Sequence, residues 1–403
     1  MASTFRRIKP APLTERVRTR EAFTYMYRVL RVIGWLPPKE LFWRNVYSIW
    51  TFVFFVIVVF YLPVAFLISY VTEFRSFSPS EFLLSIQGAF NVLGASINAL
   101  ITYNCLWRLK KIQTIFDRLD ERLLNDGDRQ KIHDIVARCN YIFLIYTFCY
   151  CIGVAVQTGV VVSGSPPWAV YIPFLNWRAG KVKLYIQTIL EFITVTFVVL
   201  HALIPEAGPL LFALIFRKHF EVLKDHIRNL RMDPDKTEQE NYEELTNCIM
   251  DHKLILRCCD LLRPMVFNTV FVQFVLIGSI LGLTLFNILF FANLWETFCG
   301  MNYVFILFLQ TFPFCYICNL LFLDGEDLAN VIFHSNWVDS EPRFKNTLIN
   351  FMHHVQQPII FKAGGIFVIS VNSFITLDIR GRNGKPTMRV SAVNKERYQG
   401  QPE

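Results

Sequence analysis

The sequence carries little charge. Asp, Glu, Lys and Arg make up only 18% of its 403 residues, whereas hydrophobic residues make up 53%. An ordinary soluble domain carries about 25% charged residues. Because a large soluble core would also be apolar, the distribution of the apolar residues has to decide between a soluble protein and a membrane protein.

The motifs of common enzymes and metal sites are also missing. The chain has no His-Glu-x-x-His, no glycine-rich phosphate loop and no two Cys-x-x-Cys pairs. Its single Cys-x-x-Cys, Cys315 and Cys318, lies in an apolar run and is interpreted as two packed thiols. We therefore predict no enzyme activity, no catalytic residue, no metal site and no cofactor. No soluble basic module carries base-stacking aromatics, so we expect no nucleic-acid partner.

The apolar residues that are present fall into long blocks. A helix needs about 20 apolar residues to cross about 30 Å of hydrocarbon. A seventh and shorter candidate, residues 363–377, has 15 charge-free residues and would cover about 22 Å as a helix. The six longer blocks are 46–70, 82–107, 139–177, 184–216, 266–295 and 297–323. We predict an all-α integral membrane protein, a seven-transmembrane helical bundle in contact with membrane lipid.

The basic residues predict how this bundle is oriented. If every block spans once, 30 of the 40 Lys and Arg residues lie in the segments on the side of the N-terminus. Only four lie in the opposite loops 71–81, 163–183 and 296–300. The excess of positive charge on cytoplasmic loops then places the N-terminus in the cytosol.

The predicted organisation has seven parts. The N-terminal segment, the two anchor regions and the tail are polar, and the rest is membrane-spanning. The parts are the cytoplasmic segment 1–45, transmembrane helices one to four in 46–215, extension and anchor helices in 216–265, transmembrane helices five and six in 266–323, cytoplasmic anchor helices in 324–362, the short seventh helix 363–377 and a disordered tail 378–403.

Two glutamates fall in or beside the fourth block. Glu191 lies about 12 Å below its outer end by helical rise, where a carboxylate is costly. Two readings remain open for it: a polar group in a ligand pocket, or a side chain that reaches back to the interface. Glu206 follows Pro205, and we expect it to mark a kinked helix entering the cytosol, where carboxylates are solvated.

Several short motifs stand out in the second half of the chain. They are Asn247-Cys-Ile-Met-Asp-His-Lys-Leu-Ile-Leu with Gln273-Phe274, Gln310-Thr-Phe-Pro-Phe-Cys315, Asp327-Leu-Ala-Asn-Val-Ile-Phe-His-Ser-Asn-Trp337, and Gln357-Pro-Ile-Ile-Phe-Lys-Ala-Gly-Gly365 with Ser370, Ser373 and Phe374. In order and spacing the chain from Asn45 to Leu377 resembles insect odorant receptors, and the similarity is strongest from Leu245 onward.

The resemblance implies a function in olfaction. Members of that family are odorant-gated non-selective cation channels in the plasma membrane of olfactory sensory neuron dendrites. They are heterotetramers of tuning receptors with a shared co-receptor. Their cytoplasmic helices anchor the subunits, the seventh helix lines the pore, and odorants bind in the outer half, among the second, third, fourth and sixth spans. This chain resembles a tuning subunit, because segment 216–265 lacks the long insert of the co-receptor.

Residues at the implied sites can be named. Volatile ligands are small and apolar, so aromatic walls with few polar groups are expected around them. The candidate ligand-binding residues are Phe90 and Asn91 on the second span, Tyr150, Val154 and Gln157 on the third, Tyr185, Thr188, Phe192 and Thr196 on the fourth, and Tyr303, Phe305 and Phe308 on the sixth. The candidate anchor residues are Leu245, Ile249, Leu254, Leu261, Leu328, Ile332 and Trp337, and the candidate pore residues are Val371 and Phe374.

The end of the chain departs from the family pattern. After Leu377, where the family continues as an apolar helix, this chain continues with a polar segment that contains Gly381, Gly384 and Pro386. Glycine and proline continue a helix poorly. An alternative function is therefore a non-conducting splice variant that binds the co-receptor.

Two other receptor classes share part of this pattern. A gustatory receptor shares the orientation, but its Thr-Tyr…Gln-Phe signature is missing. A G-protein-coupled receptor would need an external N-terminus, and its Asp-Arg-Tyr and Asn-Pro-x-x-Tyr motifs are missing as well.

The orientation gives a first testable prediction. An epitope inserted after Met1 should be stained by antibody only in permeabilised cells, because the excess of basic residues holds that side in the cytosol. A tag of known external location on a co-expressed protein serves as the control for intact membranes. Staining of intact cells would show that the orientation is inverted.

Overall fold

Six helices of the described residues are long and apolar enough to cross a membrane. The structure is a computed structural model that describes residues 7–37, 41–123, 125–357, 359–364 and 367–369. Its elements are η1 (Thr19–Phe23), α1 (Thr24–Val32), α2 (Leu41–Val56), η2 (Ile57–Tyr61), α3 (Leu62–Glu73), η3 (Phe74–Ser76), α4 (Pro79–Asp120), α5 (Asp126–Thr158), η4 (Gly159–Ser163), η5 (Trp177–Ala179), α6 (Lys181–Arg228), α7 (Glu238–Phe290), α8 (Leu294–Phe333), α9 (Pro342–Val355), β1 (Lys362–Ala363) and β2 (Phe367–Val368).

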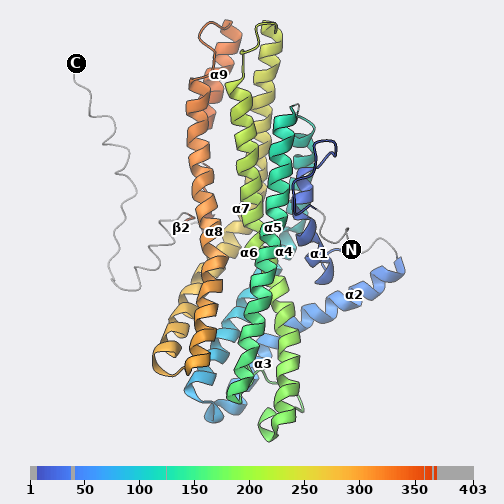
Figure 1. Cartoon of the computed structure of the whole chain (residues 1–403), viewed down its shortest axis with the longest axis vertical. Helices are drawn as coiled ribbons and strands as arrows, with labels where there is room; N and C mark the ends of the chain where they lie inside the picture. The colour runs from blue at the N-terminus through green and yellow to red at the C-terminus, as the bar shows by residue number, and fades with distance from the viewer. Residues whose placement is uncertain (1–6, 38–40, 124, 358, 365–366, 370–403) are drawn as a thin grey trace, which may run out of the picture.

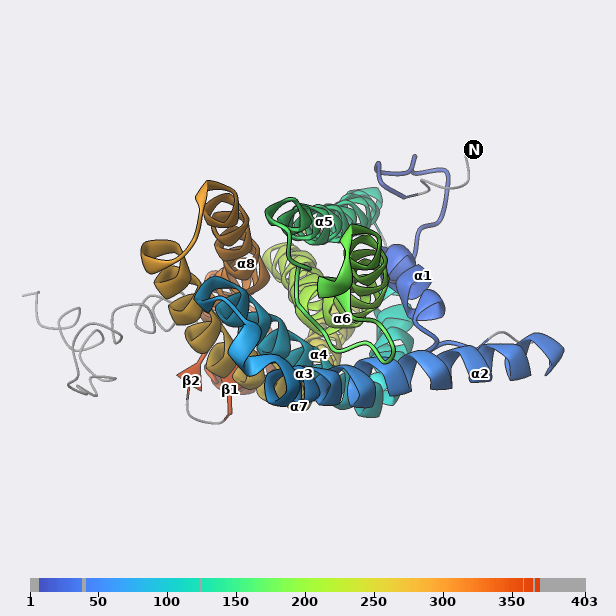
Figure 2. The ribbon, with the colours of Figure 1, turned by 90° about the horizontal axis from the view of Figure 1, so that it is seen from below.

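The long helices run side by side as one elongated bundle (Figure 1). The α4–α5 and α6–α7 connections and α9 lie toward one end, which we call the α9 end. The turns that follow α3, α5 and α7 lie at the opposite end, which we call the loop end. This is the alternation that the distribution of basic residues predicts. Helix α2 departs from the bundle and projects sideways, as the view along the long axis shows (Figure 2).

Helices α4, α7 and α8 begin at side-chain caps that the sequence encodes. Helix α8 starts with a capping box in which the Asn293 side chain accepts from the Glu296 N–H at 2.9 Å, and Glu296 accepts from the Asn293 N–H at 3.1 Å. This satisfies N–H groups that have no partner within the helix. The prediction of an outer loop at 296–300 is therefore wrong, because Glu296 caps a helix that already begins at Leu294.

Helices α6 and α7 extend well beyond a bilayer. They contain 48 and 53 residues, which corresponds to about 72 Å and about 80 Å of helix. Their extensions meet in a hydrophobic core at the α9 end that includes Phe216, Phe220 and Leu245. The fourth apolar block and the apolar pattern that follows it thus form one continuous helix, α6. The helix that leads into the fifth block forms a second continuous helix with that block, α7.

The predicted anchor residues lie in or against this core. Leu245, Leu328 and Ile332 are fully buried within the chain itself. Ile249, Leu254, Leu261 and Trp337 are partly buried and pack against the same core. Their apolar faces are therefore largely covered by the chain's own helices, and little of their surface remains for a partner.

The segment expected to form the seventh span begins differently. Lys362–Ala363 and Phe367–Val368 pair as a short antiparallel hairpin, so the prediction of a helix starting at Ala363 is wrong for the described residues. Gly364 has φ +57°, and a Cβ there would lie 2.4 Å from a ring carbon of Phe271. The left-handed turn against a neighbouring ring thus requires glycine. The predicted pore residues Val371 and Phe374 lie outside the described residues.

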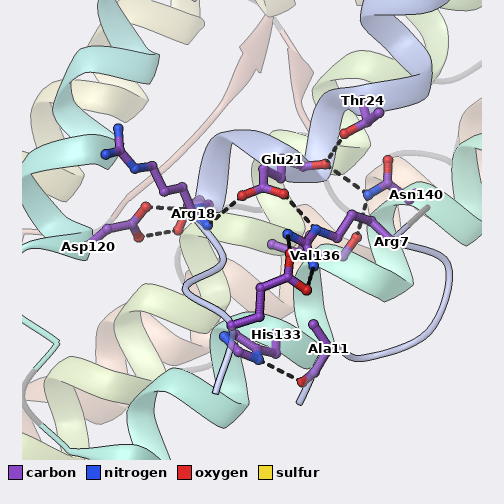
Figure 3. A network of polar contacts seen from close by, with 11 residues as sticks. Arg7, Ala11, Arg18, Glu21, Thr24, Asp120, His133, Val136 and Asn140 are labelled. Atoms are coloured by element: carbon purple, nitrogen blue, oxygen red, sulfur yellow. Dashed lines mark hydrogen bonds and ion pairs between the residues drawn. The ribbon is translucent and has the colours of Figure 1, made fainter. Parts of the chain in front are cut away.

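The N-terminal segment is tied to the bundle by polar contacts (Figure 3). The Arg7 guanidinium donates to Glu15 at 2.7 Å and to Glu21 at 2.6 Å. At the end of α4, the carboxyl group of Asp120 accepts from the Thr19 N–H at 2.7 Å and from the Thr19 hydroxyl at 2.5 Å. The Asn140 amide of α5 donates to the Glu21 carbonyl at 2.9 Å. These contacts connect residues 7–24 with both α4 and α5.

We expect Asp120→Ala to destabilise the protein by about 1.5–3 kcal/mol, because a hydrogen bond to a carboxylate is worth that much when its donors are buried. Thr19 is fully buried, so its N–H would lose its partner and its hydroxyl would keep only the longer contact with His219 Nε2 at 3.4 Å. The matched control is Asp117→Ala, three residues earlier, since its contacts to Arg18 and Arg20 are long at 3.5 Å and surface pairs contribute about 1 kcal/mol or less. Thermal unfolding in detergent measures both, and equal losses would contradict this role of Asp120.

Candidate ligand cavity

A cavity of about 150 Å³ lies in the half of the bundle nearest the loop end. Its walls come from the first half of α4, the end of α5, the middle of α6 and α7, and the first half of α8. Most of the wall is apolar, and representative aliphatic residues are Val92, Ala95, Val198, Leu276, Ile280 and Ile306. A small and largely apolar chamber between helices is a common form of ligand site.

A buried carboxyl group lies in the wall of this cavity. One oxygen of Glu206 accepts from the Tyr150 hydroxyl, and the other accepts from the Gln310 amide at 2.6 Å. Glu206 is buried inside α6, and the helix continues through Pro205 and Pro209 to Arg228. The expectation that Glu206 is solvated at a helix end is therefore wrong, because the helix does not end there and side chains of α5 and α8 replace water around the carboxyl group.

A second polar pair crosses the cavity wall. The Asn91 amide of α4 donates to the Tyr303 hydroxyl of α8. Amide side chains are frequent around the cavity as a whole. Among the described residues, those that line it are Gln87, Asn91, Asn98, Gln157, Gln273, Asn302 and Gln310.

The loop between α5 and α6 forms part of the wall. Trp168 lines the cavity and packs so closely on α4 that a Cβ on Gly88 would lie 2.7 Å from its indole ring. Ala169, the next residue, has φ +50°, a left-handed conformation that is unfavourable for residues with a Cβ. Its carbonyl accepts from the Ser69 hydroxyl of α3 at 2.7 Å. Such a conformation persists only where the surroundings hold it.

Glu191 supplies most of that support. Its carboxyl oxygens accept from the Trp168 N–H at 3.1 Å and from the Val170 N–H at 2.8 Å. The Gln187 amide donates to Glu191 at 2.7 Å and to the Val170 carbonyl at 2.6 Å. Glu191 is 1% exposed. It neither lines the cavity nor reaches back to the interface. It fixes the loop that forms the wall, a role that the sequence did not reveal.

Five of the predicted ligand-binding residues line the cavity. They are Asn91, Tyr150, Val154, Gln157 and Tyr303. The structure places the other seven outside its lining: Phe90, Tyr185, Thr188, Phe192, Thr196, Phe305 and Phe308. Tyr185 and Phe305 are each 57% exposed on the outer surface of the bundle. Apolar residues on a membrane helix face lipid as readily as a cavity, so residue type alone did not separate the two faces.

Other lining residues are not in the predicted set. Gln87, Asn98 and Gln273 are amides in long apolar runs, and Gln273 belongs to one of the family motifs. Their spacing from Asn91 is one signal that could have indicated Gln87 and Asn98. They lie four and seven residues from Asn91, which places all three on the same face of a helix. The described residues contain no group of His, Cys, Asp and Glu side chains suited to a metal ion.

Comparison with known proteins assigns the chain to a family. The family model "7tm Odorant receptor" matches residues 78–377. The chain belongs to this odorant receptor family. Odorant receptor 59b of Drosophila melanogaster is 57% identical over 93% of this chain and 94% of its own length, and odorant receptor 42b of the same species is 48% identical with the same coverage. The protein is therefore a multi-pass membrane receptor of the tuning type and not an enzyme.

Solved structures support the same fold for this receptor. The insect olfactory receptor OR5 from Machilis hrabei matches with a TM-score of 0.72 at 15% identity, over 89% of this chain and 96% of that chain. The same protein in complex with eugenol matches with a TM-score of 0.69 at 14% identity, over 89% and 95%. The membrane helical bundle predicted from the sequence is thereby confirmed.

The support of the loop by Glu191 can be tested. In Glu191→Ala, the amides of Trp168 and Val170 should exchange hydrogen about 10- to 100-fold faster, because each loses a hydrogen bond worth about 1–3 kcal/mol when buried. Glu191→Gln keeps one acceptor oxygen and should give an intermediate rate. Ile193→Ala is the control, because Ile193 is 46% exposed on the same helix. Hydrogen-exchange mass spectrometry of the loop peptide measures this, and unchanged protection in Glu191→Ala would refute the role.

Proposed function

We propose that this receptor binds a small volatile molecule in the cavity between α4 and α8 and, together with the co-receptor, forms an odorant-gated non-selective cation channel. The single observation that carries the proposal is the cavity itself, about 150 Å³ and largely apolar. A cavity of that size lined by apolar residues holds a molecule as large as benzene. The complex of the related Machilis hrabei receptor with eugenol supports a small-molecule ligand.

The ligand-binding residues that we propose are those of the predicted set that line the cavity. They are joined by residues that only the structure reveals, among them Gln87, Trp168 and Glu206. Phe192, Phe305 and Phe308 are partly exposed on the outer face of their helices, where lipid contact is expected in a membrane. They are not part of the proposed site.

The co-receptor would bind at the α9 end. The predicted anchor residues pack largely inside the chain, so the surface left for a partner consists of exposed apolar residues on the same helices. Met250, Phe333 and Ile349 are 41%, 58% and 46% exposed. Apolar side chains outside the bilayer favour burial on another subunit. We infer that these residues, rather than Leu245 or Ile332, contact the co-receptor. The complex would lie in the plasma membrane of olfactory neuron dendrites.

A second function concerns the atypical tail. The polar sequence after Leu377 favours a subunit that binds ligand and co-receptor but conducts poorly, because the pore-lining helix of the family would be cut short. Val371 and Phe374 remain the predicted pore residues. Cation current recorded with and without the co-receptor separates a conducting receptor from a non-conducting partner.

Filling the cavity tests the ligand site. Ala95→Leu adds three carbons to the wall and should lower odorant potency at least 10-fold, since the ligand and the new side chain would occupy the same volume. The matched control, Ala155→Leu, adds the same group on an exposed position of α5 and should leave potency unchanged. Dose–response currents in cells that co-express the co-receptor measure both, at equal surface expression. Full potency of Ala95→Leu would place the ligand elsewhere.

A further inference from the structure

Much of helix α2 is not covered by the rest of the described chain. The helix projects sideways from the bundle, and its first residue lies nearer the α9 end than its last (Figures 1 and 2). Ile49 and Phe52 on this helix are 66% and 68% exposed. The helix is held to the end of α1 by side-chain contacts, among them the Tyr47 hydroxyl, which donates to the Arg31 carbonyl at 2.6 Å. An apolar helix exposed in this way requires an apolar medium around it.

The charge-free stretches of two helices stop at the same level of the molecule. Residues 82–107 of α4 carry no charge, and neither do residues 45–72, which include most of α2. Trp35, just after α1, lies next to α4, with its ring 5.9 Å from that of Tyr103. The end of α1 therefore contacts both helices close to where their charge-free stretches stop. This level marks the boundary between hydrocarbon and water.

Basic side chains gather at this boundary from three helices. Four of them are exposed and one is half-buried. Among the described residues, none of the five has an ion pair. They are Arg31 of α1, Arg44 of α2, and Arg108, Lys110 and Lys111 of α4, and we call them the basic belt.

The acidic side chains nearest to the basic belt are engaged elsewhere. Asp117, the first acidic residue of α4 after the belt, contacts two arginines of the N-terminal segment. Helix α7 packs along α4, and its Asp260 pairs with Arg263 of the same helix at 2.7 Å. The described residues between 24 and 72 include no Asp or Glu. The positive charge of the belt is therefore not neutralised by the chain itself.

We propose that the junction of α1, α2 and α4 binds anionic phospholipid of the cytosolic leaflet. The lipid phosphates lie at the basic belt, and α2 lies obliquely among the acyl chains. The excess of basic residues assigns this side of the membrane to the cytosol. Clusters of four to eight Lys and Arg residues at the cytosolic end of membrane spans attract anionic lipid. The proposal depends neither on the odorant nor on the channel.

A lipid fits this surface better than a soluble anion does. The belt borders exposed apolar side chains, and Arg108 lies 4.7 Å above the ring of Trp107, which is 55% exposed. Tryptophan is frequent where the headgroups meet the hydrocarbon. A phospholipid supplies negative charge to the belt and hydrocarbon to Trp107 and Ile49 in one molecule, whereas a soluble anion supplies only the charge.

Lipid competition in the wild-type receptor tests the proposal without any mutation. The full chain is reconstituted in vesicles of brominated phosphatidylcholine, which quenches exposed tryptophans such as Trp50 and Trp107. Unbrominated lipid that takes its place restores the fluorescence. At 0.15 M salt, phosphatidylserine should compete at least fivefold better than phosphatidylcholine, because each Lys or Arg near an anionic surface strengthens binding by about fivefold. In 1 M NaCl this advantage should fall below twofold, since the Debye length shortens from about 8 Å to about 3 Å.

Substitutions then assign the preference to the basic belt. A triple variant with Arg108→Gln, Lys110→Gln and Lys111→Gln should lower the phosphatidylserine advantage below twofold at 0.15 M salt. A double variant with Arg31→Gln and Arg44→Gln should lower it at least twofold, because two of the five charges are removed. Size-exclusion chromatography confirms that each variant is folded, and the wild-type salt dependence stands even if a variant is not.

A matched control removes three positive charges elsewhere. Lys9→Gln, Arg16→Gln and Lys253→Gln change exposed residues in segments held near the far end of α4 and the start of α5. Asp120 at that end lies about 18 Å beyond Arg108 along the helix. This distance exceeds the Debye length of about 8 Å, so the control should keep the phosphatidylserine advantage of the wild type.

The possible results give clear decisions. Equal competition by the two lipids in the wild type, or an advantage that persists in 1 M NaCl or in both belt variants, would overturn the proposal. An equal loss in the control would attribute the preference to overall charge and overturn the assigned site. Loss of the preference in millimolar glycerophosphoserine, a headgroup without acyl chains, would identify a soluble anion as the occupant and overturn the lipid. None of these measurements involves an odorant, so each result leaves the proposed function untouched.

Discussion

Polar groups inside this bundle have to find their partners within the protein, because lipid offers no hydrogen bonds. Glu191 holds two backbone N–H groups of the α5–α6 loop, and Glu206 joins α6 to α5 and α8 through Tyr150 and Gln310. Each carboxyl group therefore connects parts of the chain that would otherwise meet only through apolar contacts. The position of Trp168, and with it one wall of the cavity, depends on the first of these connections.

The same constraint explains why the cavity is chemically distinctive. Where partners are supplied, as for Glu206, the polar groups build the wall. The Asn91 amide is likewise occupied, by the Tyr303 hydroxyl. Most of the remaining wall is apolar, and such a chamber binds its ligand mainly by shape.

The two ends of the bundle follow different rules. At the loop end the helices enclose the cavity. At the α9 end α6 and α7 continue far beyond a bilayer, and their apolar faces pack into a core with α4, α5 and the N-terminal segment. Arg7 and Asp120 fasten that segment. Most of the apolar surface there is already buried, so a partner subunit can use only the exposed residues that remain, such as Met250 and Phe333.

By itself the sequence determined the six long spans and the continuation of α6 and α7 past them, because charge-free blocks and helical periodicity are local properties of the chain. It also determined the family, through short motifs in a fixed order. Only the tertiary structure decided which residues face the cavity. Tyr185 and Tyr303 are both tyrosines of apolar spans, but Tyr185 is exposed on the outer surface of α6, whereas Tyr303 of α8 lines the cavity. It also decided that Glu206 is enclosed and Glu191 supports a loop, because both roles depend on groups from helices distant in sequence that only packing brings together.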